Sequence, residues 1–188
     1  MRAFVFGLPK AELHVHLEGT LEPAMYVKFA RRNHIASAYK TPDEVRKRLT
    51  EARDVPGFIV IYEELIHAVQ TERDFHDLAL AYFRNARAQD VVHAEVYFDP
   101  ELHIERGVPL ATVFAGLVRA RREARRFGLD AHYIMSFLRD RDAANAESVL
   151  EASRPWRAEL IGVGLDNPEV PDFPRKFAAV FERAKSQG

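Results

Sequence analysis

From residue 91 onward, short apolar segments alternate with longer amphipathic ones, and this alternation restricts the folds that the chain can adopt. Apolar runs typical of buried strands cover residues 91–98, 132–137 and 160–165. Segments with apolar side chains every three or four residues follow them, at 110–127, 143–153 and 173–185. Strands that alternate with helices form parallel sheets with helical crossovers, so the sequence predicts an α/β fold.

The first 90 residues add one strand and a long helical segment. Polar and apolar residues alternate over residues 10–16, which predicts the strand. A helical insertion is expected over about residues 21–89, with amphipathic helices at 58–69 and 75–88. The chain then holds four β/α units. Four units are half of a (β/α)8 barrel but can complete an open doubly wound sheet, so their number leaves both architectures open.

The charge balance and the lack of cysteine exclude several classes of protein. The 27 Lys and Arg residues nearly balance the 28 Asp and Glu residues, so we expect no nucleic-acid partner and no charge-driven membrane binding. Without cysteine, disulfide scaffolds, cysteine nucleophiles and cysteine-bound metals are excluded. No apolar run is long enough to span a bilayer, and residues 1–10 lack the features of a signal peptide. A cytoplasmic location is therefore expected.

Two histidines at the end of the first predicted strand are candidate metal ligands. His14 and His16 are one residue apart, so on a strand both point to the same face, about 6–7 Å from each other. Imidazole binds zinc, iron and nickel, and ligands of α/β folds gather at the carboxyl ends of strands. Glu12 and Glu18 extend the same polar face, and such a row of ionisable groups favours a cation site or a wet surface over a core.

The segment around these histidines resembles the start of the adenosine/adenine deaminase family, in the sequence LPKAELHVHLEGTLEP at residues 8–23. The likeness continues through DPELH at residues 99–103 and GVGLD at residues 162–166, in the order of the family. The resemblance implies a metal-dependent amidohydrolase on a (β/α)8 barrel, with residues 1–188 as the N-terminal part of that single domain. The segment that contains Glu18 is similar to the adenine deaminase branch of the family, because the adenosine deaminase branch usually has aspartate at the position of Glu18.

The resemblance also implies roles for the matching residues. His14 and His16 match two zinc ligands, and Glu18 matches a position that contacts the ribose in the nucleoside-cleaving branch. We expect the longer glutamate, at the mouth of the site, to favour a free base; the alternative is that it caps the following helix. Substrate contacts are implied for Phe58, Ile59, Tyr62 and Asn167, with ordinary helix packing as the alternative for the first three.

The implied reaction is the hydrolytic deamination of a small-molecule purine, with one zinc ion per complete subunit. Adenine, converted to hypoxanthine and ammonia, is the favoured substrate, and adenosine is the alternative. The family places the general-acid glutamate and the water-polarising histidine beyond the position of Gly188. We therefore expect no catalytic residue within this chain and no activity from it alone.

The remaining histidines and the sheet edges leave two further expectations. His67, His76, His93, His103 and His132 lie on amphipathic helices or within and beside strands, where the pattern favours packing or surface roles over metal binding. A half-barrel exposes the edges of a parallel sheet that is normally covered on both faces. Self-association through these edges is therefore a second hypothesis, as is a non-catalytic protein that assembles with another chain.

Overall fold

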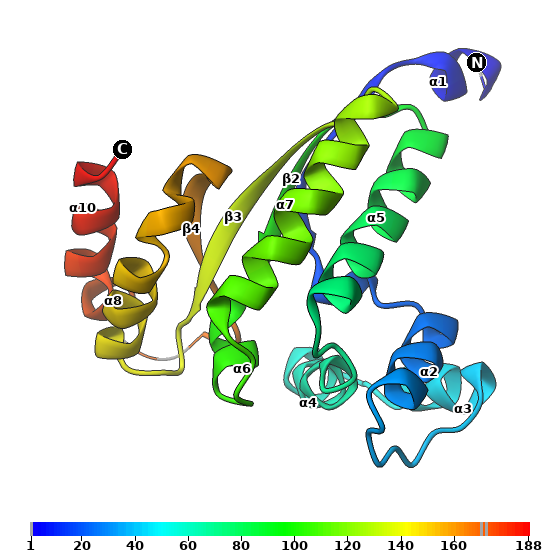
Figure 1. Ribbon diagram of the computed structural model, residues 1–188, viewed down its shortest axis with the longest axis horizontal. Helices are drawn as coiled ribbons and strands as arrows, with labels where there is room; N and C mark the ends of the chain where they lie inside the picture. The colour runs from blue at the N-terminus through cyan, green and yellow to red at the C-terminus, as the bar shows by residue number, and fades with distance from the viewer. Residues whose placement is uncertain (1, 170, 172) are drawn as a thin grey trace.

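A parallel sheet with helices packed on one of its faces organises the chain (Figure 1). The computed structural model describes residues 2–169, 171 and 173–188. Its strands pair in the order of the chain: β1 (Lys10–His16), β2 (Val91–Phe98), β3 (Asp130–Leu138) and β4 (Leu160–Asp166). Every neighbouring pair is parallel, which confirms the predicted α/β fold with four strands.

The helices form two groups along the described chain. Before β2 lie α1 (Arg2–Gly7), η1 (Glu18–Thr20), α2 (Pro23–Arg32), α3 (Pro42–Leu49), α4 (Val55–Ile66) and α5 (Glu72–Ala88). After it lie α6 (Pro100–Ile104), α7 (Leu110–Arg126), α8 (Ala143–Ala152), η2 (Arg154–Glu159), α9 (Phe173–Lys176) and α10 (Ala178–Ser186). Within the described residues, no helix combines the length and the apolar character that a membrane crossing requires.

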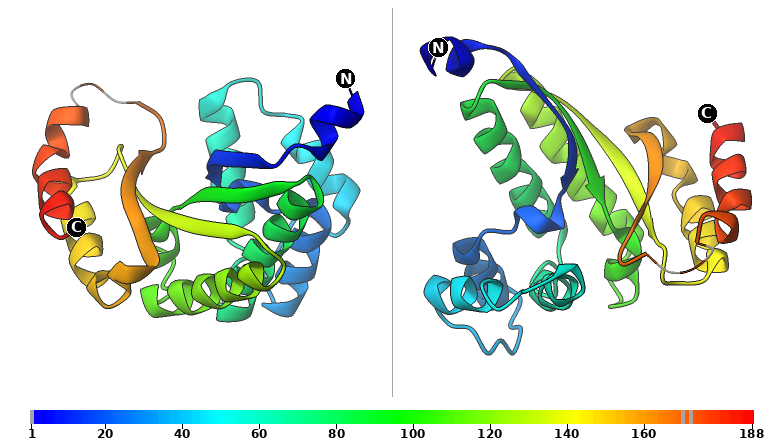
Figure 2. Two further views of the ribbon diagram at one scale, coloured as in Figure 1. Left: turned by 90° about the horizontal axis from the view of Figure 1, so that it is seen from above. Right: turned by 180° about the vertical axis from the view of Figure 1, so that it is seen from behind.

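The curvature of the sheet separates a covered face from an open one. Figure 2 shows the strands curving, with α5, α7, α8 and α10 on the convex side. Ala94, Val96 and Phe98 of β2 point to this side and are fully buried. The intervening residues of β2 face the concave side and are half-buried. Helices α4 and α6 lie at the carboxyl end of the sheet, where they border any site formed there (Figure 1).

Helices α5 and α7 pack closely because a glycine lies between them. A Cβ atom on Gly116 would lie 2.5 Å from the carbonyl oxygen of Glu72 and 2.6 Å from the Cβ atom of Phe75. No side chain fits there without moving the backbone of α5. Although α5 lies within the predicted helical insertion, it therefore packs beside α7 as a crossover helix of the sheet. The boundaries of the insertion stay a prediction.

Capping side chains start two helices earlier than periodicity alone indicated. Asp54 accepts a hydrogen bond from the Gly57 amide at 2.8 Å, so α4 begins at Val55 rather than at residue 58. Thr71 and Asp74 form a capping box, so α5 begins at Glu72 rather than at residue 75.

The helix predicted over residues 173–185 is divided in the structure into α9 and α10. Phe177 lies between the two helices with φ −99° and ψ 0°, and its ring is buried in the core. Prediction of one continuous helix there was wrong, because burial of this ring interrupts the regular turn. In the segment predicted as a loop after β2, five residues form α6.

Strand β1 has the predicted bounds, but the prediction of its polar face was wrong. Its register against β2 shifts between Glu12 and Val15, so side chains do not alternate regularly. Tyr82 of α5 donates a hydrogen bond of 2.8 Å to Glu12, which places this carboxylate on the helix-covered side. Glu12 therefore does not share a face with His14 and His16.

A buried carboxyl group attaches α6 to the end of β3. The amide of Leu138 donates a hydrogen bond of 2.6 Å to Glu101 Oε2, and the Glu101 side chain is almost completely buried. Burial raises the pKa of Glu101 to about 7, although the hydrogen bond from Leu138 opposes this change.

We expect the Glu101→Gln variant to become more stable than the parent chain as the pH rises. In the unfolded chain Glu101 ionises near pH 4.5, so between about pH 4.5 and 7 the folded parent holds more protons and loses stability with rising pH. Glutamine has no such group. The difference in the free energy of unfolding, variant minus parent, should grow by about 3 kcal/mol between pH 4 and 8. Urea denaturation across this range measures it, and a pH-independent difference would contradict the assignment.

Candidate metal and substrate site

The predicted metal ligands lie at the carboxyl edge of the sheet, where parallel strands bring distant residues together. His14 and His16 end β1, Tyr97 is the next-to-last residue of β2, and Asp166 ends β4. In the register of the sheet, His16 is paired with Tyr97. Binding sites of parallel α/β folds form at this edge, so the location agrees with the sequence prediction.

The two imidazoles approach each other through the same ring nitrogen. Nε2 of His14 and Nε2 of His16 are 3.2 Å apart. The Tyr97 ring packs against both, with ring centroids 4.8 Å from His14 and 5.3 Å from His16. Gly164 of β4 leaves room for this ring, because a Cβ atom there would lie 2.9 Å from Tyr97 Cε1. The aromatic ring thus restricts the orientation of both histidines.

Asp166 sets the protonation of His16. Its Oδ2 lies 2.7 Å from His16 Nδ1. This interaction raises the pKa of His16, against the effect of burial. Burial acts to raise the pKa of Asp166, but the contact with His16 outweighs it and the pKa is lowered. In the neutral ring, a proton on Nδ1 beside Asp166 leaves the Nε2 lone pair of His16 free to face His14 or a metal ion.

This pair of nitrogens fits a divalent metal ion. Zinc–nitrogen bonds of about 2.0–2.1 Å in a tetrahedral site put neighbouring ligand atoms roughly 3.3 Å apart, close to the observed 3.2 Å. Metal-bound histidines usually give their other N–H to a carboxylate, as His16 can give its own to Asp166. Asp99 also brings a carboxylate oxygen within 4.8 Å of donor atoms of His16 and Asp166. The site can therefore bind a cation, although the sequence analysis singled out neither aspartate.

Glu18 is buried beside this pair and held on one of its oxygens. Its Oε1 accepts hydrogen bonds from the Asp99 amide at 3.1 Å and from His103 Nε2 at 2.9 Å. Burial lowers the pKa of His103, and Arg106 contacts its Nδ1, which leaves the ring neutral with its proton on Nε2. Helix α2, which follows, has Glu22 at its N-cap, so Glu18 does not cap it.

The second oxygen of Glu18 is a free acceptor of the site, as is Asp99 Oδ1. Glu18 Oε2 is buried and has no hydrogen-bond partner among the described residues. At 2% exposure, Glu18 lies deeper than the loop mouth that we expected from the sequence. A buried carboxylate oxygen without a donor is costly, and a ligand N–H would satisfy it.

Asp99 lies between Glu18 and helix α4. The Tyr62 hydroxyl donates a hydrogen bond of 2.5 Å to Asp99 Oδ2, so Tyr62 reaches the site; its contact with a substrate stays a prediction. Burial raises the pKa of Asp99 well above its usual range, and the nearby carboxylates of Glu18 and Asp166 add to the effect. A second negative charge beside Asp166 is therefore disfavoured, which favours the protonated form of Asp99.

The other expected substrate contacts lie at different depths. The Phe58 ring is 41% exposed, one helical turn before Tyr62, with ring centroids 6.1 Å apart. Ile59 is half-buried on the same helix. Asn167 follows β4 with φ +71°; its amide donates to Asp166 Oδ1 at 2.7 Å and its side chain donates to Asp140 at 3.0 Å. Asn167 thus adjoins Asp166, whereas Phe58 and Ile59 lie on α4 within about one turn of Tyr62.

Sequence reasoning missed the roles of Asp99, His103 and Asp166. Asp99 directly follows β2 and Asp166 ends β4, so acidic residues at strand carboxyl ends were an available signal. His103 carried a weaker signal of the same kind, since it follows β2 on the side of the fold where sites form, but its contact with Glu18 depends on the fold of α6.

Comparison with known proteins identifies the family of this chain. The profile of the family described as adenosine deaminase matches residues 9–188. Adenine deaminase of Rhodospirillum rubrum is 46% identical over 99% of this chain, which spans 56% of that protein. The crystal structure of adenine deaminase from Arthrobacter aurescens is 38% identical, with a TM-score of 0.91 over 96% of this chain and 55% of that one.

A second similar solved structure contains zinc. An amidohydrolase from Burkholderia ambifaria, crystallised with bound Zn, is 30% identical with a TM-score of 0.86, over all of this chain and 52% of that one. The chain thus spans about half the length of the relatives it matches, and its four parallel units form the first half of a (β/α)8 barrel. Its sequence, its fold and the edge that carries His14 and His16 agree: the chain belongs to the adenosine deaminase family.

Proposed function

We propose that this chain forms the N-terminal half of a barrel that hydrolyses adenine to hypoxanthine and ammonia. The observation that carries the proposal is the pair of Nε2 atoms, 3.2 Å apart beside Asp166, in a chain whose relatives are named adenine deaminase. The activity is that of a protein with both barrel halves. The edges of β1 and β4, each paired with one described strand, are where the remaining strands, or a second copy of this chain, would pair.

The residues of this chain bind and orient the reactants. His14 and His16 are the proposed ligands of a divalent metal ion such as zinc. When bound, the ion supplies Lewis acidity, which makes a water molecule acidic enough to attack the purine near neutral pH. Asp166 keeps the proton of His16 on Nδ1 and so orients the ring. Asp99, fixed by Tyr62 and within 4.8 Å of Asp166, is the proposed holder of a proton beside Asp166.

Glu18 is the proposed basis of the preference for a free base. Its buried Oε2 has no donor among the described residues, and a free purine base carries a ring N–H that a nucleoside lacks. His103 and the Asp99 amide fix the other oxygen, so the carboxylate cannot turn away at low cost. Phe58, Ile59 and Asn167 are proposed to border the bound base.

Metal removal from a protein that carries both barrel halves tests the proposal. Adenine conversion, followed by absorbance and by ammonia release, should fall below about 1% of its initial rate after chelation, because water alone is a poor nucleophile near pH 7. Added zinc should restore the rate. Full activity in the metal-depleted protein, or no conversion of adenine before depletion, would contradict the proposed function.

A further inference from the structure

A second group of ligating side chains lies on the concave face at the other end of the sheet. In the register of β2 and β3, His93 is paired with Asp130 and Glu95 with His132. The residues between them, Ala94 and Ala131, are fully buried. Because side chains alternate along a strand, the four polar side chains share the face that the helices leave open.

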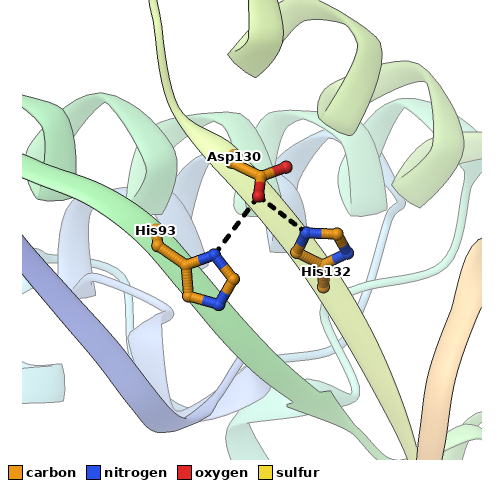
Figure 3. Close-up of side chains that lie close together, drawn as sticks. All are labelled: His93, Asp130 and His132. Carbon is orange, nitrogen blue, oxygen red and sulfur yellow. Dashed lines mark hydrogen bonds and ion pairs between the residues drawn. The ribbon is translucent and has the colours of Figure 1, made fainter.

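Two imidazoles of this group point at one carboxylate oxygen (Figure 3). Asp130 Oδ2 is 3.2 Å from His93 Nδ1 and 2.9 Å from His132 Nε2. The centroids of the two rings are 5.3 Å apart. Two nitrogens and one oxygen, all within 4.8 Å of one another, therefore converge from neighbouring strands.

The spacing and the chemistry of these atoms fit a divalent transition metal. Ligand atoms at a tetrahedral zinc ion are roughly 3.3 Å apart, given bonds of about 2.0–2.2 Å, and the two measured contacts are within a few tenths of an ångström of this value. Two imidazoles and a carboxylate are a ligand set that zinc accepts, with a fourth position for water. In this half of the barrel the side chains are 24–56% exposed.

Glu95 supplies the carboxylate that commonly supports a metal-bound histidine. Its Oε1 lies 3.4 Å from His93 Nε2. When Nδ1 of His93 binds a metal, the ring proton must be on Nε2, which faces Glu95. A carboxylate in this position fixes the tautomer and the orientation of the ring.

We propose that His93, Asp130 and His132 form a second divalent-metal site, which joins the amino ends of β2 and β3. His93 precedes Tyr97 by four residues, about 13 Å along an extended strand, so this site is separate from the one at His14 and His16. It does not rest on the proposed deaminase activity. Bound metal bridges two strands through their side chains and stabilises the folded state.

Zinc titration of the purified full chain, in competition with a chromophoric chelator, tests this site. The double variant His14→Asn/His16→Asn should retain one zinc ion per chain and a zinc-dependent rise in the midpoint of thermal unfolding. The double variant His93→Asn/His132→Asn should bind one zinc ion fewer than the parent chain. Equal zinc content in this variant and the parent, or no zinc in the first variant, would overturn the proposal.

Two controls make the result specific to this group. The variant His67→Asn removes an exposed histidine at the end of α4 and should bind as much zinc as the parent. In the background of His14→Asn/His16→Asn, Glu95→Gln should keep the stoichiometry and weaken the affinity roughly 10–100-fold. If the His93→Asn/His132→Asn variant fails to fold by circular dichroism, Glu95→Gln decides the outcome, and an unchanged affinity would overturn the proposal.

Discussion

Replacement of His14 or His16 by alanine is expected to lower kcat/KM for adenine by about 10³-fold or more in a protein with both barrel halves. Loss of a residue that merely supports a metal ligand costs roughly 10–100-fold, and loss of a ligand costs more. The two Nε2 atoms, 3.2 Å apart, are the two metal-ligand atoms that this pair supplies. Removal of either ring therefore leaves the pair with a single ligand. Steady-state rates of adenine loss at saturating zinc provide the measurement.

The fold should survive both substitutions, since His14 is exposed and the His16 side chain is 30% exposed. Circular dichroism and the midpoint of urea denaturation check this directly. His67→Ala is the matched control, because His67 is exposed and belongs to neither group of ligating residues; its activity should equal that of the parent. Near-normal activity in either the His14 or the His16 variant would refute the metal assignment.

The Glu18→Asp variant is expected to narrow the preference for adenine over adenosine by roughly 10–100-fold, which corresponds to about 1–3 kcal/mol for a buried polar partner left unpaired. Aspartate is one methylene shorter, so it cannot contact His103 and the Asp99 amide through one oxygen while presenting the other to a base. The ratio of kcat/KM for the two substrates, before and after substitution, measures the effect.

Glu12→Asp is the control for this substitution. Glu12 lies on β1, the strand that precedes Glu18, but its carboxylate accepts a hydrogen bond from Tyr82 on the helix-covered side. The same chemical change there should leave the substrate ratio unaltered. Equal rates on adenine and adenosine in the parent protein would contradict the role assigned to Glu18, as would an unchanged ratio in Glu18→Asp.

The sequence by itself determined the strands, the parallel α/β order and the location of the first candidate site. These features are local: the mainly apolar segments at residues 91–98, 132–137 and 160–165 have the length and composition of strands in a parallel sheet. The pair His14 and His16 could also be found locally, because one intervening residue on a strand puts both side chains on the same face.

Only the tertiary structure decided which polar groups meet. The register shift in β1 turned Glu12 toward α5, which no alternation pattern revealed. Glu18 and His103 are 85 residues apart in the chain and nevertheless form a buried hydrogen bond. Such contacts depend on the angle at which α6 meets the sheet, and single-sequence periodicity contains no information about that angle.

The second proposed metal site likewise could not be found from the sequence and depends on the tertiary structure. His93 and His132, taken singly, had the pattern of ordinary strand residues, and their spacing of 39 positions gave no reason to associate them. Parallel pairing of His93 with Asp130 places both imidazoles at one carboxylate oxygen. The sequence of a strand sets which face of the strand each side chain occupies. The register between strands sets which side chains become neighbours. That register depends on the lengths and packing of the intervening helices.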